Sequence, residues 1–101
     1  MKQPRIIRTD GTEIPYFPKS KSKGFTLDEL KKAIRKDEND DPFIQVVPMR
    51  TTGQCLVCDE DGINKGLAQN SIATVECALD VIIGPDGIRG NVLICPEDMI
   101  Q

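Results

Sequence analysis

The sequence contains no histidine and no tryptophan, and its aromatic residues are one tyrosine and three phenylalanines among 101 residues. Histidine is the commonest general base in enzymes and the commonest zinc ligand, so its absence removes the usual centre of both kinds of site. Few aromatic rings also argue against a platform that stacks single-stranded bases. No serine lies in a nucleophile elbow, and no carboxylate pair is clearly set in an apolar pocket. We therefore expect a protein that is not an enzyme and has no cofactor.

Long apolar runs are absent as well. No segment approaches the length that spans a bilayer. The first residues, MKQPRIIRTDG, lack the apolar centre of a signal peptide. We therefore expect no membrane segment and a cytoplasmic location, in a bacterium or in an infected host cell. In such a reducing setting the four cysteines are expected to be thiols.

The charged residues are unevenly distributed. Residues 1–36 carry ten Lys or Arg and four Asp or Glu, a net of +6, whereas residues 37–101 carry three and twelve, a net of −9. Together they make the net charge of −3. Such polarity can produce an anion-binding face. The alternative is that the halves neutralise each other within the fold or between subunits, and we expect a homo-oligomer.

The first 24 residues predict a hairpin followed by a basic linker. Residues 5–8 and 12–14 have strand composition, and Asp10-Gly11 between them supplies the positive φ angles of a tight turn. Residues 15–24, PYFPKSKSKG, contain two prolines, two serines and three spaced lysines. This composition predicts a linker rather than a packed element.

A helix is predicted from about residue 27 to 36. Thr26 and Glu29 form a capping-box pattern, and Phe25 can pack on Leu30 as a hydrophobic staple. Leu27, Leu30 and Ile34 recur at helical spacing and predict the buried face. The acidic stretch 37–41 and Pro42 should end the helix.

The remaining segments favour strands. Residues 43–47 and 54–59 read as strands, with Pro48 ending the first or marking a sheet edge. The apolar residues of 71–79 fit the spacing of a helix as well as that of a strand, and a short helix is favoured. Residues 81–83 and 91–94 flank Gly-Pro-Asp-Gly and predict a second hairpin. The chain is thus expected to be one domain, 1–101, with an α+β core at 25–101 and a mainly antiparallel sheet of four to six strands, on which one or two helices pack.

The cysteines raise the question of a metal site. Their spacing is C-x2-C-x18-C-x17-C, with one close pair, whereas a zinc ribbon normally uses two. Positions i and i+3 of a strand face opposite sides of a sheet, so the sulfurs of Cys55 and Cys58 should diverge. Asp59 and Glu60 would raise the pKa of a redox thiol at Cys58. An EF-hand alignment fails at Val57 and Ala68, where the loop needs acids. We expect no metal ligands.

The stretch CLVCDEDGINKGLAQN carries a resemblance. It is similar to the N-E-E-G-x-x-x-x-L-P-x-N signature of a small domain of unknown function found in phage, prophage and plasmid proteins. Glu60, Gly62, Leu67 and Asn70 match, whereas Asp59 replaces the Asn and Ala68 the Pro. Similar flanks, an L-x-x-L helix and strands at 44–48 and 80–84, extend the resemblance over roughly residues 25–95. It implies an accessory protein of a mobile element and supplies no catalytic residues.

Two stretches are candidates for binding an anion. Lys19, Lys21 and Lys23 lead to the start of the predicted helix, where free N–H groups and the helix dipole favour negative charge. Arg50, Thr51 and Thr52 combine a guanidinium with two hydroxyls on a turn, and Asn70 of the signature completes the candidate ligand-binding set. The alternatives are a solvated linker and an ordinary hairpin turn.

The leading functional hypothesis is a counter-defence protein that sequesters a nucleotide-type anionic signal in the host cell. A first alternative is an inhibitor whose acidic face binds a host nuclease or defence complex. A second is a zinc-stabilised structural module.

Overall fold

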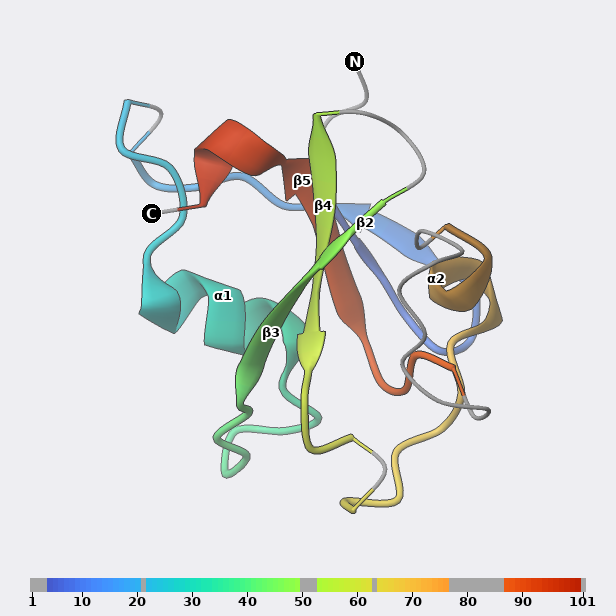
Figure 1. Ribbon diagram of the computed structural model, residues 1–101. Coiled ribbons are helices and arrows are strands. Elements are labelled where there is room, and N and C mark those ends of the chain that lie inside the picture. Colours follow the sequence, from blue (N-terminus) through green and yellow to red (C-terminus); the bar gives the residue numbers. More distant parts are fainter. Residues whose placement is uncertain (1–3, 21, 50–52, 63, 77–86, 101) are drawn as a thin grey trace.

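The computed structural model describes residues 4–20, 22–49, 53–62, 64–76 and 87–100 (Figure 1). The strands among these residues are β1 (Arg5–Ile7), β2 (Glu13–Pro15), β3 (Ile44–Pro48), β4 (Gln54–Asp59) and β5 (Val92–Pro96). They form one antiparallel sheet in the order β2-β1-β5-β4-β3. The helices are α1 (Leu27–Ile34) and α2 (Ser71–Glu76), and a 3-10 turn, η1, covers Glu97–Met99. The predicted fold class, a small α+β protein with an antiparallel sheet, is confirmed.

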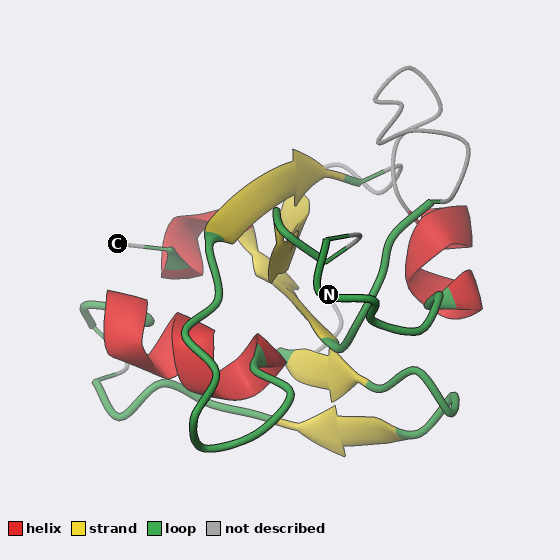
Figure 2. Ribbon diagram, turned by 90° about the horizontal axis from the view of Figure 1, so that it is seen from below, coloured by secondary structure: helices red, strands yellow, loops and turns green. Residues whose placement is uncertain are grey.

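The sheet is covered on both faces. One core cluster lies under α1 and contains Phe25, Leu30, Ala33, Ile34, Cys55, Val57, Leu93 and Cys95. The other contains Ala73 of α2 with Ile7, Val47, Met49, Leu56, Cys58, Ile88, Val92 and Ile94. Figure 2 shows α1 and α2 on different sides of the strands. Because β4 and β5 lie inside the sheet and are covered on both faces, every residue of both strands is buried, including the polar Gln54 and Asp59 at the ends of β4.

The position of β5 corrects one sequence prediction. Residues 91–94 were expected to pair with 81–83 in a hairpin, but Leu93 and Ile94 pair with β1 on one side and β4 on the other. Both edges of β5 are therefore occupied, and residues 81–83 lie outside the described part of the chain. A turn signal such as Gly-Pro-Asp-Gly favours the nearest strand in sequence, whereas an all-apolar strand is most stable where both of its faces are buried.

Helix α1 starts where the capping box predicts. The Thr26 hydroxyl accepts the N–H of Glu29 at 3.2 Å, and the Glu29 carboxylate accepts the N–H of Thr26 at 2.9 Å. The helix ends at Ile34, two residues before the predicted end. Its buried residues are Leu30, Ala33 and Ile34, and the prediction that Leu27 is buried is wrong, since 59% of it is exposed. Phe25, which precedes the helix, is fully buried and belongs to the core cluster under α1.

Thr26→Ala is expected to lower the free energy of unfolding by about 1 kcal/mol, because the first turn loses its side-chain acceptor. Chemical denaturation measures the change. Thr9→Ala, at an exposed threonine of the β1–β2 turn, is the control and should stay within about 0.5 kcal/mol of the parent. Equal effects of the two substitutions would contradict a structural role for the cap.

The N-terminal hairpin forms as predicted, with one difference in its turn. Arg8 and Thr12 close the loop through Arg8 N–H to Thr12 O at 2.9 Å, and Gly11 N–H donates to Arg8 O. Only Gly11 takes a positive φ, 92°, because no described non-glycine residue does so. The loop is thus longer than a two-residue turn, and one left-handed glycine is enough to reverse the chain.

The segment expected to be a solvated linker is instead packed on α1. The Tyr16 ring stacks on Phe25 with centroids 5.5 Å apart, and its hydroxyl donates to the carbonyl of Glu29 at 2.8 Å. Pro18 is buried. Gly24 has a φ of 79°, and a Cβ there would lie 2.3 Å from the carbonyl oxygen of Met99. The linker prediction rested on the prolines, serines and lysines, whereas Tyr16 and Pro18, which precede the lysines, anchor the segment.

Strand β3 is an edge of the sheet, which explains Pro48. Glu60 donates its N–H to Phe43 O at 2.8 Å. Hydrogen-bonded pairs alternate along the β3–β4 ladder, so Pro48, opposite Cys55, falls at a position whose nitrogen faces away from β4. The missing N–H of proline therefore costs no ladder bond, and the predicted edge position is confirmed.

Among the described residues, no helix has the length and apolar character needed to cross a membrane. The described part of residues 71–79 is the six-residue helix α2, in agreement with the predicted short helix.

Candidate functional site

The structure describes three of the seven predicted ligand-binding residues. Lys19 and Lys23 are exposed on the segment before α1, and Asn70 is buried with 1% of its surface accessible. Lys21, Arg50, Thr51 and Thr52 lie outside the described residues, so the predicted turn site stays a prediction. Of the three described residues, Lys19 lines a cleft.

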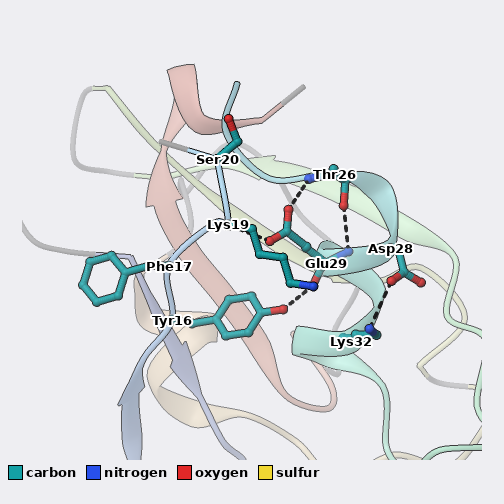
Figure 3. Close-up of a pocket in the computed structure, with 8 residues that line it drawn as sticks. All are labelled: Tyr16, Phe17, Lys19, Ser20, Thr26, Asp28, Glu29 and Lys32. Carbon is teal, nitrogen blue, oxygen red and sulfur yellow. Dashed lines mark hydrogen bonds and ion pairs between the residues drawn. The ribbon is translucent and has the colours of Figure 1, made fainter. Parts of the chain in front are cut away.

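That cleft, which we name the helix-start cleft, has a volume of about 290 Å³. It is lined by Tyr16, Phe17, Lys19, Ser20, Thr26, Asp28, Glu29 and Lys32 (Figure 3). Figure 3 shows the ring of Phe17 turned away from the helix. Lys32 pairs with Asp28 at 3.2 Å, so one of the two lysines is already opposed by a carboxylate.

A carboxylate of the chain itself occupies the anion position at the start of α1. Glu29 accepts the N–H of Thr26 and the N–H of Lys19, each at 2.9 Å. These two backbone hydrogen bonds hold the pKa of Glu29 below its ordinary value. Glu29 therefore already binds two backbone N–H groups beside the start of α1. With two lysines and two carboxylates in its lining, the helix-start cleft carries no excess of positive charge. Burial, and then the charges of Glu29 and Asp28, raise the pKa of Tyr16.

The buried side chain of Asn70 is bonded to three backbone groups of the fold. Its amide nitrogen donates to the carbonyls of Ile7 and Gly90, each at 3.0 Å. Its side-chain oxygen accepts the N–H of Ala73 at 3.1 Å, which caps α2. This one side chain joins β1, the residues before β5 and α2. A ligand-binding role for Asn70 stays a prediction, and a ligand would have to compete with these three bonds.

The acidic D-E-D-G stretch contains a buried ion cluster that the sequence did not reveal. The Lys65 ammonium lies 2.6 Å from Asp40 Oδ1 and 2.7 Å from Asp59 Oδ2. The side chains of Asp40 and Asp59 are 5% and 1% exposed, and that of Lys65 is 17% exposed. Burial raises the pKa of Asp40, but hydrogen bonds and the charge of Lys65 more than offset it, so this pKa lies below its ordinary value. The two carboxylates raise the pKa of Lys65 against the opposing effect of burial.

The second oxygen of Asp59 organises the surrounding backbone. Asp59 Oδ1 accepts the N–H of Phe43 at 3.2 Å and the N–H of Asp61 at 2.9 Å. The segment at 37–43 and the turn at 59–65, far apart in sequence, are therefore held together at one end of β3 and β4.

Beside this ion cluster lies a recess of about 410 Å³, lined by Phe43, Glu60, Asp61 and Asn64. We name it the acidic recess. Phe43 is 65% exposed, the most exposed of the large apolar residues described. Glu60 is exposed beside it, whereas Asp61 accepts a hydrogen bond from Asn64 at 2.6 Å. A negative recess with one aromatic wall is suited to a cationic group. Phe43 is not among the predicted site residues, although an aromatic residue two positions after the acidic run 37–41 is a signal that could have indicated it.

The cysteines lie as the alternation of a strand predicts. Cys55 belongs to the core cluster under α1 and Cys58 to the cluster on the opposite face, so the predicted divergence of the two sulfurs is confirmed. This geometry opposes a zinc knuckle at the C-x-x-C pair. Within the described ranges no group of three His, Cys, Asp or Glu side chains has an arrangement that could hold a metal ion.

Comparisons of the chain with protein-family models, with curated proteins and with solved structures found no match.

Proposed function

We propose that the protein is a non-enzymatic accessory protein of a phage or other mobile element, which inhibits a host nuclease or defence complex by binding a basic surface of it. The observation that carries the proposal is the acidic recess, where the exposed ring of Phe43 stands beside the exposed carboxylate of Glu60. The mobile-element origin rests on the resemblance of residues 59–70 to the phage-domain signature. The homo-oligomer stays a prediction.

The chemistry of the acidic recess favours an arginine of the partner. A guanidinium can stack on an aromatic face and bind a carboxylate at the same time, whereas an ammonium is a strongly hydrated point charge. Phe43 and Glu60 offer this combination. Glu38 on the neighbouring loop is also exposed and adds to the negative field that would steer a basic partner.

The rigidity of the acidic recess also supports binding. The Lys65 cluster holds the two segments that form the wall, and the N–H of Phe43 is bonded to Asp59. A preformed surface loses less conformational entropy on binding than a mobile one. Catalysis is not proposed, because the chain has no histidine and the best-buried carboxylates are already bound to Lys65.

The helix-start cleft favours a second candidate, the sequestration of a nucleotide-type anion. Lys19 and Lys32 lie at the cleft and could contact a phosphate. The carboxylates of Asp28 and Glu29 oppose it, and Glu29 already binds the N–H groups of Thr26 and Lys19. We therefore rank this function below binding at the acidic recess.

The test uses a matched pair of double variants. The parent, immobilised, is used to capture proteins from a nuclease-treated bacterial lysate, and each captured protein is purified and assayed for loss of nucleic-acid binding when the parent is added. Phe43→Ala with Glu60→Lys should weaken this inhibition at least about tenfold. Phe17→Ala with Asp28→Lys removes an aromatic ring and reverses one carboxylate charge at the helix-start cleft in the same way, and it should leave the inhibition unchanged.

Calorimetry with linear and cyclic nucleotides separates the two candidates. We expect no binding heat from the parent. Nucleotide binding that Lys19→Ser weakens would support the helix-start cleft instead. Equal inhibition by both double variants would overturn the proposal for the acidic recess.

A further inference from the structure

Two cysteines that the proposed function does not use face each other across the sheet. Cys55 of β4 and Cys95 of β5 are register partners, and both lie in the core cluster under α1. They are 3% and 1% exposed. The pair is thus two buried thiols that lie opposite each other on neighbouring strands, on the same face of the sheet.

In an antiparallel ladder, the distance between two opposite Cα atoms depends on whether their residues form a hydrogen-bonded or a non-hydrogen-bonded pair. Glu97 donates its N–H to Gly53 O at 2.9 Å, which makes Gly53 and Glu97 a hydrogen-bonded pair of the β4–β5 ladder. Pairs of this kind recur at every second residue, so Cys55 and Cys95 are also such a pair, with Cα atoms about 5.5 Å apart. Disulfides span Cα separations of about 4.4 to 6.8 Å. The backbone is therefore already placed for a bridge.

The Cβ atoms are less favourably placed. In a hydrogen-bonded pair they lie about 5.5 Å apart, whereas a relaxed disulfide brings them to about 3.8 Å. Closing the bridge must pull the two strands together locally. A strained disulfide has a higher reduction potential and is reduced readily, which is a property of reversible rather than permanent bridges.

We propose that Cys55 and Cys95 are a modification site, a redox pair that a small-molecule disulfide such as glutathione disulfide closes reversibly into a cross-strand bond. The proposal is independent of the function of the acidic recess. The bridge would tie the start of β4 to the end of β5 directly beneath α1.

The reaction balances as two thiol–disulfide exchanges. The Cys55 thiolate attacks one sulfur of the oxidant, forms a mixed disulfide and releases one thiolate of the oxidant. The Cys95 sulfur, after losing its proton, attacks the Cys55 sulfur and releases the second. The protein loses two electrons and two protons, and the oxidant becomes two thiols. The neighbouring Cys95 side chain lowers the pKa of Cys55, against the effects of burial and of the Glu97 carboxylate, so we assign the first attack to Cys55.

The oxidant can reach the pair at the end of the sheet. Cys55 is the second residue of β4 and Cys95 precedes the last residue of β5. The adjoining η1 segment is held by Glu97 N–H to Gly53 O and by Phe25 N–H to Met99 O. Local opening of so short a segment requires far less free energy than global unfolding.

The experiment treats the folded, full-length chain with glutathione disulfide, blocks the remaining thiols and maps the peptides by mass spectrometry. The expected product is lighter by two hydrogens, contains a Cys55–Cys95 crosslink and returns to the thiol form with dithiothreitol. Cys58→Ala is the matched control, because Cys58 is in the same strand and 2% exposed but lies on the opposite face. This variant should form the bridge as the parent does.

Cys55→Ala and Cys95→Ala should each abolish the crosslink. The peptide map of the parent decides the question even where one of these variants fails to fold. A parent that keeps all its thiols, that carries only glutathione adducts, or that crosslinks through Cys58 or Cys77 would overturn the proposal.

Discussion

Lys65→Met is expected to lower the free energy of unfolding by about 3 kcal/mol, because it leaves two buried carboxylates facing each other without their cation. The side chains of Asp40 and Asp59 are almost fully buried, and their carboxylates lie 2.6 and 2.7 Å from the ammonium. The measurement is chemical denaturation at pH 7. Lys32→Met removes the cation of an exposed ion pair with Asp28 and is the matched control, with an expected change under about 1 kcal/mol.

The effect of Lys65→Met should depend on pH in a definite direction. The pKa of Asp40 is lowered in the folded state, so its contribution to stability is present above the ordinary carboxyl pKa and is lost as the pH falls through the folded-state value. The pKa of Lys65 is raised, so its contribution is complete below the ordinary amine pKa and is lost as the pH rises through the folded-state value. The difference between parent and variant should therefore be largest between about pH 4 and 10.

A difference that stays constant from acidic to neutral pH would contradict this account of the cluster. Equal destabilisation by Lys65→Met and Lys32→Met would do the same, since it would mean that the buried ion pairs stabilise no more than an exposed pair.

Asn70→Ala is expected to destabilise the protein by about 3 kcal/mol. The substitution leaves the carbonyls of Ile7 and Gly90 without their buried donor and removes the cap of α2. Asn64→Ala is the control, because Asn64 is exposed and bonds Asp61 at the surface, where about 0.5 kcal/mol is the usual change. An Asn70→Ala variant as stable as Asn64→Ala would refute the role assigned to the buried amide.

Asn70→Asp separates the two tasks of this side chain. A carboxylate can still accept the N–H of Ala73, but its other oxygen would face the carbonyl oxygens of Ile7 and Gly90. At pH 7 we expect Asn70→Asp to be at least as unstable as Asn70→Ala, because a buried charge then lacks a donor. As the pH falls, the carboxyl takes up a proton and can donate one bond, so part of the loss should be recovered. Denaturation curves at several pH values measure this recovery, and its absence would contradict the assigned geometry.

The local elements could be predicted because each depends on a few neighbouring residues. Thr26 and Glu29 begin α1 through bonds across three residues. The alternation of a strand places Cys55 and Cys58 on opposite faces without reference to the rest of the fold. Pro48 indicates a sheet edge because it lacks an N–H wherever it lies.

The candidate site was harder to predict because its residues meet through tertiary contacts. Lys65 reaches Asp40 across 25 positions, and Asn70 reaches Ile7 across 63. The spaced lysines are visible in the sequence. The capping-box pattern predicts only one of the two backbone contacts of the Glu29 carboxylate, its bond to the N–H of Thr26. Its bond to the N–H of Lys19 depends on how residues 15–24 fold back on α1.

The sequence by itself determined the α+β class, the start of α1, the strand at 54–59 and the opposite directions of Cys55 and Cys58. Stereochemistry and short-range hydrogen bonds determine these features, and both are fully contained in a few consecutive residues. Only the tertiary structure decided that β5 lies between β1 and β4, that Lys65 joins two buried carboxylates, and that Phe43 is left exposed beside Glu60. These three arrangements depend on which surfaces of the chain are buried against each other, away from water. Burial is decided by the whole chain, because an apolar strand or a charged group is stable only where its neighbours, however distant in sequence, cover or pair it.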